Sequence, residues 1–347
     1  MATIRMKLLD VPDITEQDWQ DFISIRSDML GETYPDSPVP SYENQKIEYS
    51  SAREWENLVQ IWLAYDEQEH CVGMFDTTFP RSHHPNYETN RNNLWIGFYV
   101  RKAHRCQGIG TQMLETVLER ARFFGANFVY APVELDTGHA FAKTFGAQEA
   151  SVDRISRLAI VDTDWNMLQT WIDEGKAKNP DVKIVRIEGL PPANDIEAYC
   201  HLVNGIVETV PHQDIEDEEY TLTVEELRKT HQRNLERGHR YIALYAKDKD
   251  NSLMGVTGMV HENVDEKNSY VGLTGVLPEY RGRGLGKYLK ALMSYDLREH
   301  FPKVQYAYTG NAEVNAPMLS INVRMGFKPY KRRSIYKIAL EDLAAKI

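Results

Sequence analysis

The fold is decided by one stretch of the chain, Thr274-Gly-Val-Leu-Pro-Glu-Tyr-Arg-Gly-Arg-Gly-Leu-Gly-Lys-Tyr-Leu-Lys290. The apolar, aromatic-rich run Tyr270–Val276 leads into its glycines and predicts a strand. Four apolar residues after the glycines share one face of a predicted amphipathic helix: Leu285, Leu289, Leu292 and Met293. A glycine turn at the start of a helix presents free backbone N–H groups at the positive end of the helix dipole. The stretch therefore predicts a phosphate or pyrophosphate site.

Two better-known phosphate motifs do not fit this stretch. A Walker loop needs an early glycine where Arg281 stands, and a serine or threonine where Tyr288 follows Gly286-Lys287. A Rossmann fingerprint needs Gly-x-Gly-x-x-Gly after the first strand of a βαβ unit. Here the spacing is Gly282-x-Gly284-x-Gly286, and a meander of strands precedes it.

The same pattern occurs earlier in the chain. Arg105-Cys-Gln-Gly108-Ile-Gly110 recurs as Arg281-Gly-Arg-Gly284-Leu-Gly286, an offset of 281 − 105 = 176 residues. The flanking features repeat in the same order: a predicted hairpin (61–75 and 241–256), a strand before the glycines (94–100 and 270–276) and a strand after the helix (127–130 and 304–308). Such self-similarity at one period indicates a duplicated domain of about 150–170 residues.

Both copies resemble the GNAT superfamily of acetyltransferases, whose Arg/Gln-x-x-Gly-x-Gly/Ala signature grips the pyrophosphate of CoA. The stretch 274–290 looks like motif A of that family, and 311–327 looks like its motif B. The tandem layout is similar to that of mycothiol synthase. The resemblance implies an α/β (α+β) protein of two tandem GNAT domains. Each would have a mixed, mostly antiparallel sheet that is splayed at its central strands, with helices on both faces. We expect domains at 1–161 and 181–347, joined by a linker helix within 162–180.

The resemblance also implies where acetyl-CoA, the expected co-substrate, would bind. Backbone N–H groups around Val276 and Leu277 would serve the thioester carbonyl and the pantetheine arm. Asn315 matches the asparagine that hydrogen-bonds this arm, although an N-cap for the following helix explains it equally well. The pyrophosphate would lie on the signature loop, which consists of Arg281, Gly282, Arg283, Gly284, Leu285, Gly286 and Lys287.

The catalytic groups are less clear, because this chain departs from the family. Many members have a tyrosine as proton donor seven residues after the pantetheine asparagine, where this chain has Asn322. Another tyrosine (Tyr308 or Tyr330) or water could replace it, or the domain could bind acetyl-CoA without turnover. Glu313 is a candidate general base, and three further residues are alternatives: Glu262, His212 and Asp214. We select Glu313 and Tyr308 as the catalytic pair.

The N-terminal copy keeps Arg105, Gly108 and Gly110 as possible CoA contacts. Its motif B is eroded, with Ala142 at the tyrosine position and no asparagine for pantetheine. We expect this half to be structural and not to catalyse.

Composition limits the function further. The 347 residues are 42% hydrophobic and 26% charged, with a net charge of −11. This is typical of a globular protein, disfavours nucleic acid as a partner and favours a cationic substrate. No apolar run reaches the roughly 20 residues of a membrane span, and the N-terminus lacks an apolar signal segment. Three scattered cysteines indicate neither disulfides nor a metal site.

We therefore expect a cytoplasmic protein, monomeric or homodimeric, without a metal. Its predicted activity is acetyl-CoA-dependent N-acetylation of a primary amine of a small molecule, by direct attack on the thioester. A non-catalytic acyl-CoA sensor and a protein N-acetyltransferase are the alternatives.

Overall fold

The computed structural model describes all residues except 1–2, 10–13, 51–56, 85, 211–213 and 216–220. The chain divides into two compact units. Unit 1 comprises residues 1–152, 213–220 and 333–347, and unit 2 comprises residues 153–212 and 221–332.

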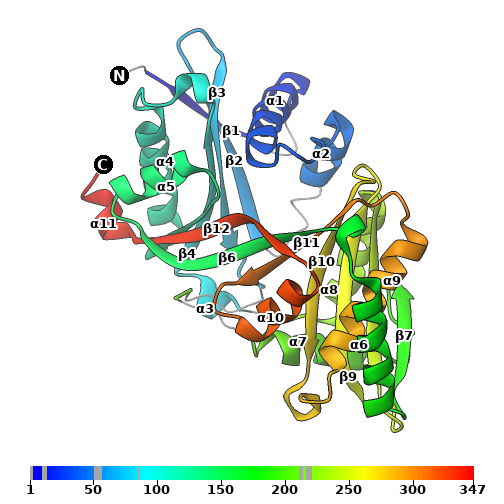
Figure 1. Cartoon of the computed structure of the whole chain (residues 1–347). Coiled ribbons are helices and arrows are strands. Elements are labelled where there is room, and N and C mark those ends of the chain that lie inside the picture. Colours follow the sequence, from blue (N-terminus) through cyan, green and yellow to red (C-terminus); the bar gives the residue numbers. More distant parts are fainter. Residues whose placement is uncertain (1–2, 10–13, 51–56, 85, 211–213, 216–220) are drawn as a thin grey trace. The chain divides into compact units, whose positions relative to one another are not determined.

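The helices and strands follow the order predicted from the two repeats (Figure 1). The first repeat contains β1 (Arg5–Leu9), α1 (Glu16–Thr33), α2 (Tyr42–Ser50), β2 (Asn57–Tyr65), β3 (Cys71–Pro80), α3 (Tyr87–Asn90), β4 (Asn93–Val100), η2 (Lys102–His104), α4 (Ile109–Phe124), β5 (Phe128–Val133), α5 (Asp136–Thr144) and β6 (Gln148–Ala159).

The short helix η3 (Ile160–Asp162) and the helix α6 (Trp165–Lys178) connect the repeats. The second repeat contains β7 (Lys183–Glu188), α7 (Ile196–Val207), α8 (Val224–Glu236), β8 (His239–Lys247), β9 (Leu253–Glu262), β10 (Asn268–Val276), η4 (Pro278–Tyr280), α9 (Leu285–His300), β11 (Tyr306–Ala312), α10 (Ala316–Arg324), β12 (Lys328–Ala339) and α11 (Leu340–Ala344).

Unit 1 contains a sheet with the strand order β1-β2-β3-β4-β5-β12. All pairs are antiparallel except β4 and β5, which are parallel over only three residue pairs, from Asn93↔Phe128 to Trp95↔Tyr130. Beyond that point the two strands diverge. The edge strand β12 contributes Ser334–Ala339, which pair with β5.

Unit 2 has the same architecture, with the strand order β7-β8-β9-β10-β11-β6. Its parallel pair, β10 and β11, is also limited to three residue pairs, from Asn268↔Tyr306 to Tyr270↔Tyr308. The edge strand β6 contributes residues 153–159, which pair with β11. The mixed, mostly antiparallel and splayed sheets predicted from the sequence are thus confirmed.

The compact units do not coincide with the two repeats. The end of β6 belongs to the first repeat in sequence but completes the sheet of unit 2. The end of β12 belongs to the second repeat but completes the sheet of unit 1. Each repeat therefore gives its last strand to the other unit, a connectivity that the domain ranges 1–161 and 181–347 do not describe.

Helices cover both faces of each sheet, as expected. In unit 1, α4 packs on one face and α1 on the other, and the buried side chains form two separate clusters. In unit 2, α6 and α9 cover one face, while α7 and α8 cover the other. The helix expected as a linker, α6, is part of the unit 2 core, where Leu168, Trp171 and Ile172 are buried.

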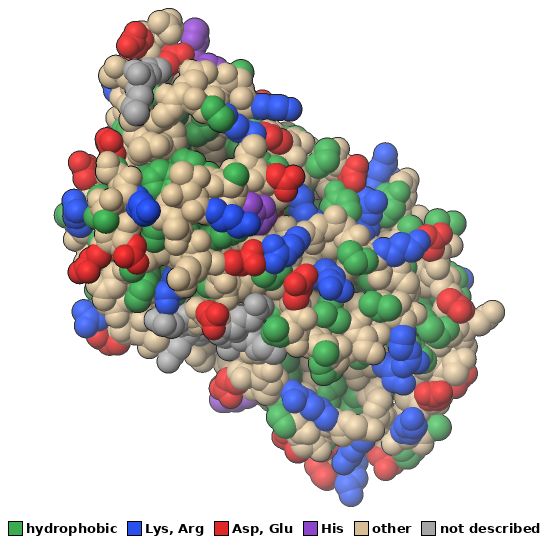
Figure 2. All heavy atoms as spheres, turned by 60° about the vertical axis from the view of Figure 1, so that its left-hand side comes forward, with side chains coloured by type: hydrophobic (Ala, Val, Ile, Leu, Met, Phe, Trp, Pro, Cys, Tyr) green, Lys and Arg blue, Asp and Glu red, His purple; other side chains and the backbone are tan. Residues whose placement is uncertain are grey.

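On the face shown in Figure 2, acidic and basic side chains are interspersed rather than gathered by sign. Among the helices that the structure describes, none has the length and apolar character required to cross a membrane.

Candidate functional site

The predicted phosphate-binding turn of unit 2 is formed as the sequence suggests. After β10 and η4, Gly282 and Gly284 take the left-handed conformation, with φ of 81° and 77°. A Cβ at either position would meet no atom within 4 Å, so the space beside both glycines is open. Gly284 is the N-cap of α9 and gives the helix no side-chain cap. The first N–H groups of α9 are therefore available to an anion.

Positive charge surrounds this turn. The Arg281 Nε donates to the carbonyl oxygen of Val276 (2.9 Å), and its Nη2 donates to the Thr209 hydroxyl (2.7 Å). These partners are uncharged, so the guanidinium keeps its net charge. Lys287 lies on the first turn of α9, with its Nζ 3.9 Å from the carboxylate of Glu174. The turn combines free N–H groups with exposed cations, which is the chemistry that binds a pyrophosphate.

The central strand of unit 2 is irregular where it faces the splay. The register between β10 and β9 shifts between Val271 and Thr274, which leaves Gly272 and Leu273 in a bulge. The N–H of Leu277 donates to the Met254 carbonyl oxygen (3.0 Å), so this predicted donor is already used within the sheet. The extra residue of a bulge is left out of the hydrogen-bond ladder, so the bulge backbone at Gly272 and Leu273, beside the point where β10 and β11 separate, is a candidate source of donors in its place.

Tyr308, selected as a catalytic residue, is the last residue of β11 that pairs with β10. Its ring is buried, stacks on Tyr270 (centroids 5.6 Å apart) and meets Tyr330 edge-on (5.4 Å). Glu313 is exposed in the turn after β11, with a carboxylate oxygen 3.9 Å from the Arg154 guanidinium. Tyr308 therefore lies where β10 and β11 separate, and Glu313 follows the end of β11.

Two asparagines that flank the splay have clear structural roles. The Asn315 side chain accepts from the Met318 N–H (3.3 Å) and caps α10, as the alternative interpretation predicts. Asn322, at the position of the family tyrosine, is 1% exposed and donates to the Asn311 Oδ1 (2.6 Å). The Oδ1 of Asn322 is buried and has no hydrogen-bond partner among the described residues.

The other candidate bases are placed less favourably. Glu262 ends β9, 4.0 Å from a ring nitrogen of His239. Asp214 groups with unit 1, and its N–H donates to the Ala150 carbonyl oxygen. His212 lies outside the described residues.

The equivalent turn in unit 1 has the same backbone shape but a different charge. Cys106 (φ 60°) and Gly108 (φ 84°) take the places of Gly282 and Gly284. Both terminal nitrogens of Arg105 donate to the Glu32 carboxylate, at 2.8 and 2.6 Å. This bidentate pair lowers the pKa of Glu32 and neutralises the cation that would attract a phosphate.

The glycine turn of unit 1 is also more crowded than that of unit 2. Phe98 of β4 stacks on Phe141 of α5, with their centroids 5.6 Å apart. A Cβ at Gly110 would lie 3.0 Å from the Phe141 ring, whereas one at Gly286 would keep an ordinary contact of 3.8 Å to Ile321. The pairing of β3 with β4 has no register shift. In the described part of unit 1, the strand pair β3–β4 therefore has no bulge, the arginine of the turn is paired with a carboxylate, and Gly110 is crowded.

Sequence reasoning missed Glu32, Thr209, Phe141 and Lys290, a buried lysine on α9. The first two contact their arginines across 73 and 72 residues of sequence, and no local pattern marks such pairs. Lys290 follows Leu289 at the edge of the apolar face of α9, and a lysine on an otherwise apolar border was the only available signal.

In the part of the chain that the structure describes, no three His, Cys, Asp or Glu side chains gather in a way that could hold a metal ion. No curated protein matches the sequence. The family model for acetyltransferases of the GNAT family matches residues 19–147 and 210–327, one stretch in each repeat.

Solved structures with the same fold include a tandem protein. A tandem GNAT protein from the clavulanic acid biosynthesis pathway is similar over 97% of this chain and 99% of its own, with a TM-score of 0.74 and 19% identity. A GCN5-related N-acetyltransferase from Sphaerobacter thermophilus is similar over 97% and 96%, with a TM-score of 0.65 and 14% identity. A GCN5-related glucosamine N-acetyltransferase region of a fungal multi-domain β-N-acetylglucosaminidase matches over 97% of this chain and 38% of its own, with a TM-score of 0.68 and 15% identity.

Proposed function

Because the chain belongs to the GNAT family of acetyltransferases, we propose that unit 2 binds acetyl-CoA and transfers its acetyl group to a primary amine of a small molecule. The observation that carries the proposal is the difference between the two signature turns. In unit 2, the partners of Arg281 among the described residues are uncharged, and the glycine turn is open. In unit 1, Glu32 neutralises Arg105 and Phe141 crowds Gly110.

In this proposal the pyrophosphate lies on the N–H groups at the start of α9. The side chains of Arg281, Arg283 and Lys287 supply the positive charge around it. The pantetheine arm enters the splay between β10 and β11, and the side chain of Asn315 borders its path. The thioester then lies beside the bulge at Gly272, where the register of β10 with β9 is interrupted.

The acceptor amine must be neutral to attack the thioester carbonyl. Glu313, exposed at the end of β11, is the proposed base and takes up the proton directly or through water. The net charge of −11 favours the approach of a cationic amine. Hydrogen-bond donors already in place for the oxyanion of the tetrahedral intermediate make the largest contribution to lowering the activation barrier. The backbone N–H groups of the bulge are our candidates for these donors.

A non-catalytic acyl-CoA sensor is the second candidate function. It is favoured by one observation, the buried Asn322 in place of a proton-donating tyrosine. An asparagine amide does not donate a proton at neutral pH. Under this alternative, unit 2 binds acetyl-CoA and releases no CoA in the presence of amines.

A matched pair of variants tests the assignment of the working unit. Gly284→Trp and Gly108→Trp place the same side chain at left-handed positions with φ of 77° and 84°, so the backbone strain is similar. Calorimetry with acetyl-CoA should show binding by wild type and Gly108→Trp and a loss of binding by Gly284→Trp. The reverse result would assign the site to unit 1.

Release of CoA against a panel of small primary amines then separates an enzyme from a sensor. Binding without amine-dependent release would favour the sensor. Release only with peptides that carry a free amine would favour a protein N-acetyltransferase.

A further inference from the structure

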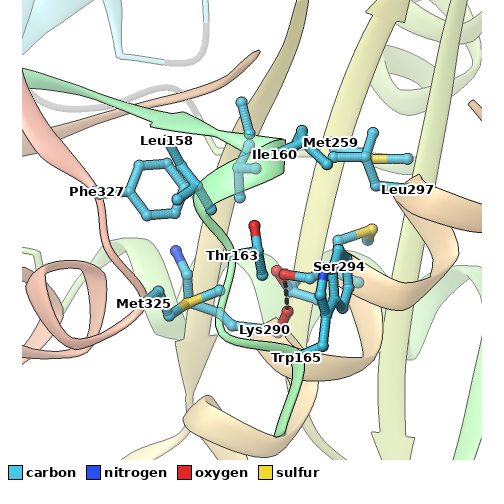
Figure 3. A pocket seen from close by; sticks show the side chains of 14 residues that line it. Leu158, Ile160, Thr163, Trp165, Met259, Lys290, Ser294, Leu297, Met325 and Phe327 are labelled. Carbon is cyan, nitrogen blue, oxygen red and sulfur yellow. Dashed lines mark hydrogen bonds between the residues drawn. The ribbon is translucent and has the colours of Figure 1, made fainter. Parts of the chain in front are cut away.

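A small cavity lies in the core of unit 2, between the sheet and α9 (Figure 3). Its volume is about 20 Å³, enough for about one water molecule. Val271 of β10 and Ala307 of β11 line it at the point where these strands stop pairing. The bulge of β10 begins directly after Val271. The cavity therefore lies at the base of the splay, below the place proposed for the thioester.

The side chain of Lys290 enters this cavity from α9, and Figure 3 shows its nitrogen directed toward Leu158 and Phe327. The residue is 3% exposed. Within the described part of the chain, its amine has no ion pair or hydrogen bond, and the centroid of the Phe327 ring lies 5.7 Å from Nζ. The hydroxyl of Thr163, also on the cavity wall, is buried without a hydrogen-bond partner.

Apart from Lys290 itself, no charged side chain lines the cavity among the residues that the structure describes. The groups that line the cavity from β6, η3, α6, β9, β10, β11 and the end of α10 are apolar or are hydroxyls, and Ser294 is the neighbour on α9 itself. The Ser294 hydroxyl donates to the Lys290 carbonyl oxygen (3.0 Å) and so is already used. Burial alone lowers the pKa of Lys290 to about 8.

Burial of such an amine destabilises the folded chain, because an isolated ammonium group loses its hydration. A methionine or leucine would fill the same space at a lower free-energy cost. Unpaired buried polar groups with shifted pKa values gather at functional sites. Because Lys290 lies at the base of the splay, a function for its amine would concern the reaction proposed there.

We propose that Lys290 protonates the thiolate of CoA as it leaves, directly or through one water in the cavity; this role rests on the function proposed above. The neutral amine attacks the thioester carbonyl carbon, the carbon–sulfur bond breaks, and its electron pair goes to sulfur. The Lys290 ammonium gives its proton to that sulfur, and the new amide nitrogen loses its own proton to solvent. Solvent then reprotonates Lys290. Amine and acetyl-CoA become amide and CoA thiol.

Two observations favour Lys290 over Tyr308 as the donor. Successive residues of a strand point to opposite faces, and Ala307 faces the cavity, so Tyr308 faces the other side, among Tyr270 and Tyr330. The proton affinity of Lys290 also suits the task. A thiol has a pKa of about 8.5, and proton transfer is efficient when donor and acceptor are matched near the working pH.

The test compares Lys290→Met with wild type, using acetyl-CoA and hydroxylamine, an acceptor that is already neutral at pH 7. The variant should bind acetyl-CoA with a Kd within threefold of wild type by calorimetry, while kcat falls by about 10²–10⁴-fold. In wild type, kcat should decline above a pKa near 8, as the donor loses its proton, and this decline should be absent from the variant. Lys290→Arg, which keeps the charge but holds its proton too tightly, should also be slow.

Ser294→Ala is the matched control, because it alters the same cavity wall without removing a proton donor. It should keep kcat within threefold of wild type. A Lys290→Met enzyme with wild-type kcat and an unchanged decline at high pH would overturn the role of Lys290 and leave the proposed acetyltransferase intact. The same is true if Tyr308→Phe, and not Lys290→Met, abolishes that decline. Failure of wild type to bind acetyl-CoA, or to release CoA with hydroxylamine, would overturn both proposals.

Discussion

Replacing Lys290 with methionine should make the protein more stable. The variant keeps the length of the side chain and fills the same space, but it removes an amine that folding takes out of water. The pKa of this amine falls from 10.5 to about 8 on burial. At 1.36 kcal/mol per pKa unit, the shift corresponds to about 3 kcal/mol of destabilisation of the wild type below pH 8. A gain of that size raises Tm by several degrees in a domain of this size.

The pH dependence identifies the cause. Below about pH 8, Lys290 is protonated in both folded and unfolded chains, and the wild type carries the whole penalty. From about 8 to 10.5 the folded chain loses the proton first, so wild-type stability rises relative to the variant by up to about 1.36 kcal/mol per pH unit. Above 10.5 both forms are neutral and this contribution disappears.

Urea unfolding of both proteins at pH 7, 8, 9 and 10 measures this difference, in which all other titrating groups cancel. Lys303→Met is the control, since its side chain is 72% exposed and pairs with Glu266 at the surface. Its effect should stay below about 1 kcal/mol and should not vary in this way with pH. A Lys290→Met protein that is less stable than wild type, or a difference independent of pH, would refute the reasoning, because it would mean that the amine has a partner in the folded chain.

Substitutions at three further positions and one truncation test other features. Thr209→Glu should neutralise Arg281, as Glu32 neutralises Arg105 in unit 1, and so remove the charged hydrogen bond from Arg281 to the pyrophosphate, which is worth about 1.5–3 kcal/mol. Calorimetry should then show acetyl-CoA binding at least about tenfold weaker than in wild type. Thr209→Val is the uncharged control, and unchanged affinity of Thr209→Glu would contradict the role given to Arg281. Asn315→Asp keeps the cap of α10 but loses the amide donor, so it should lower the affinity for acetyl-CoA without lowering Tm. Asn315→Ala loses the cap as well, so it should also reduce the free energy of unfolding by about 1 kcal/mol. If both variants bind acetyl-CoA as tightly as wild type, Asn315 does not contact the cofactor. Asp195→Asn removes the charged partner of the buried Lys247 amine, 2.7 Å away. Urea unfolding should show a free energy of unfolding about 3–5 kcal/mol lower than in wild type. A decrease below about 1 kcal/mol would show that the ion pair contributes little to stability. A chain of residues 181–347 lacks β6 and α6 and should fail to give a cooperative transition by circular dichroism, where a sharp transition would show that the strand exchange is dispensable.

The elements of the fold could be read from local patterns in the sequence. The run Tyr270–Val276 predicted β10, which spans Asn268–Val276, and the glycine turn predicted the start of α9 at Leu285. The connecting helix predicted within 162–180 is α6, Trp165–Lys178. These features depend on periodicity and on glycine conformation, both of which are properties of neighbouring residues.

The pairing of the last strands could not be read in this way. The ends of β6 and β12 carry similar alternating patterns, and such a pattern fits the edge of either sheet. The burial of Lys290 could not be predicted for a related reason. A lysine at the border of an apolar helix face usually extends to solvent; here the border is covered by Leu158 of β6 and Phe327 after α10, which are distant in sequence.

The strand exchange also gives the first repeat a structural role that does not depend on cofactor binding. In unit 1 the signature arginine is neutralised by Glu32 and Gly110 is crowded by Phe141. The β5 strand of unit 1 pairs with Ser334–Ala339 of β12, the strand that follows α10 of the second repeat. In return, the first repeat supplies residues 153–159 as the strand that pairs with β11, one of the two strands of the splay. Loss of either sheet would leave an unpaired strand attached to the other, with exposed backbone donors and acceptors. The first repeat can therefore lose its chemistry while the packing of the second still depends on it.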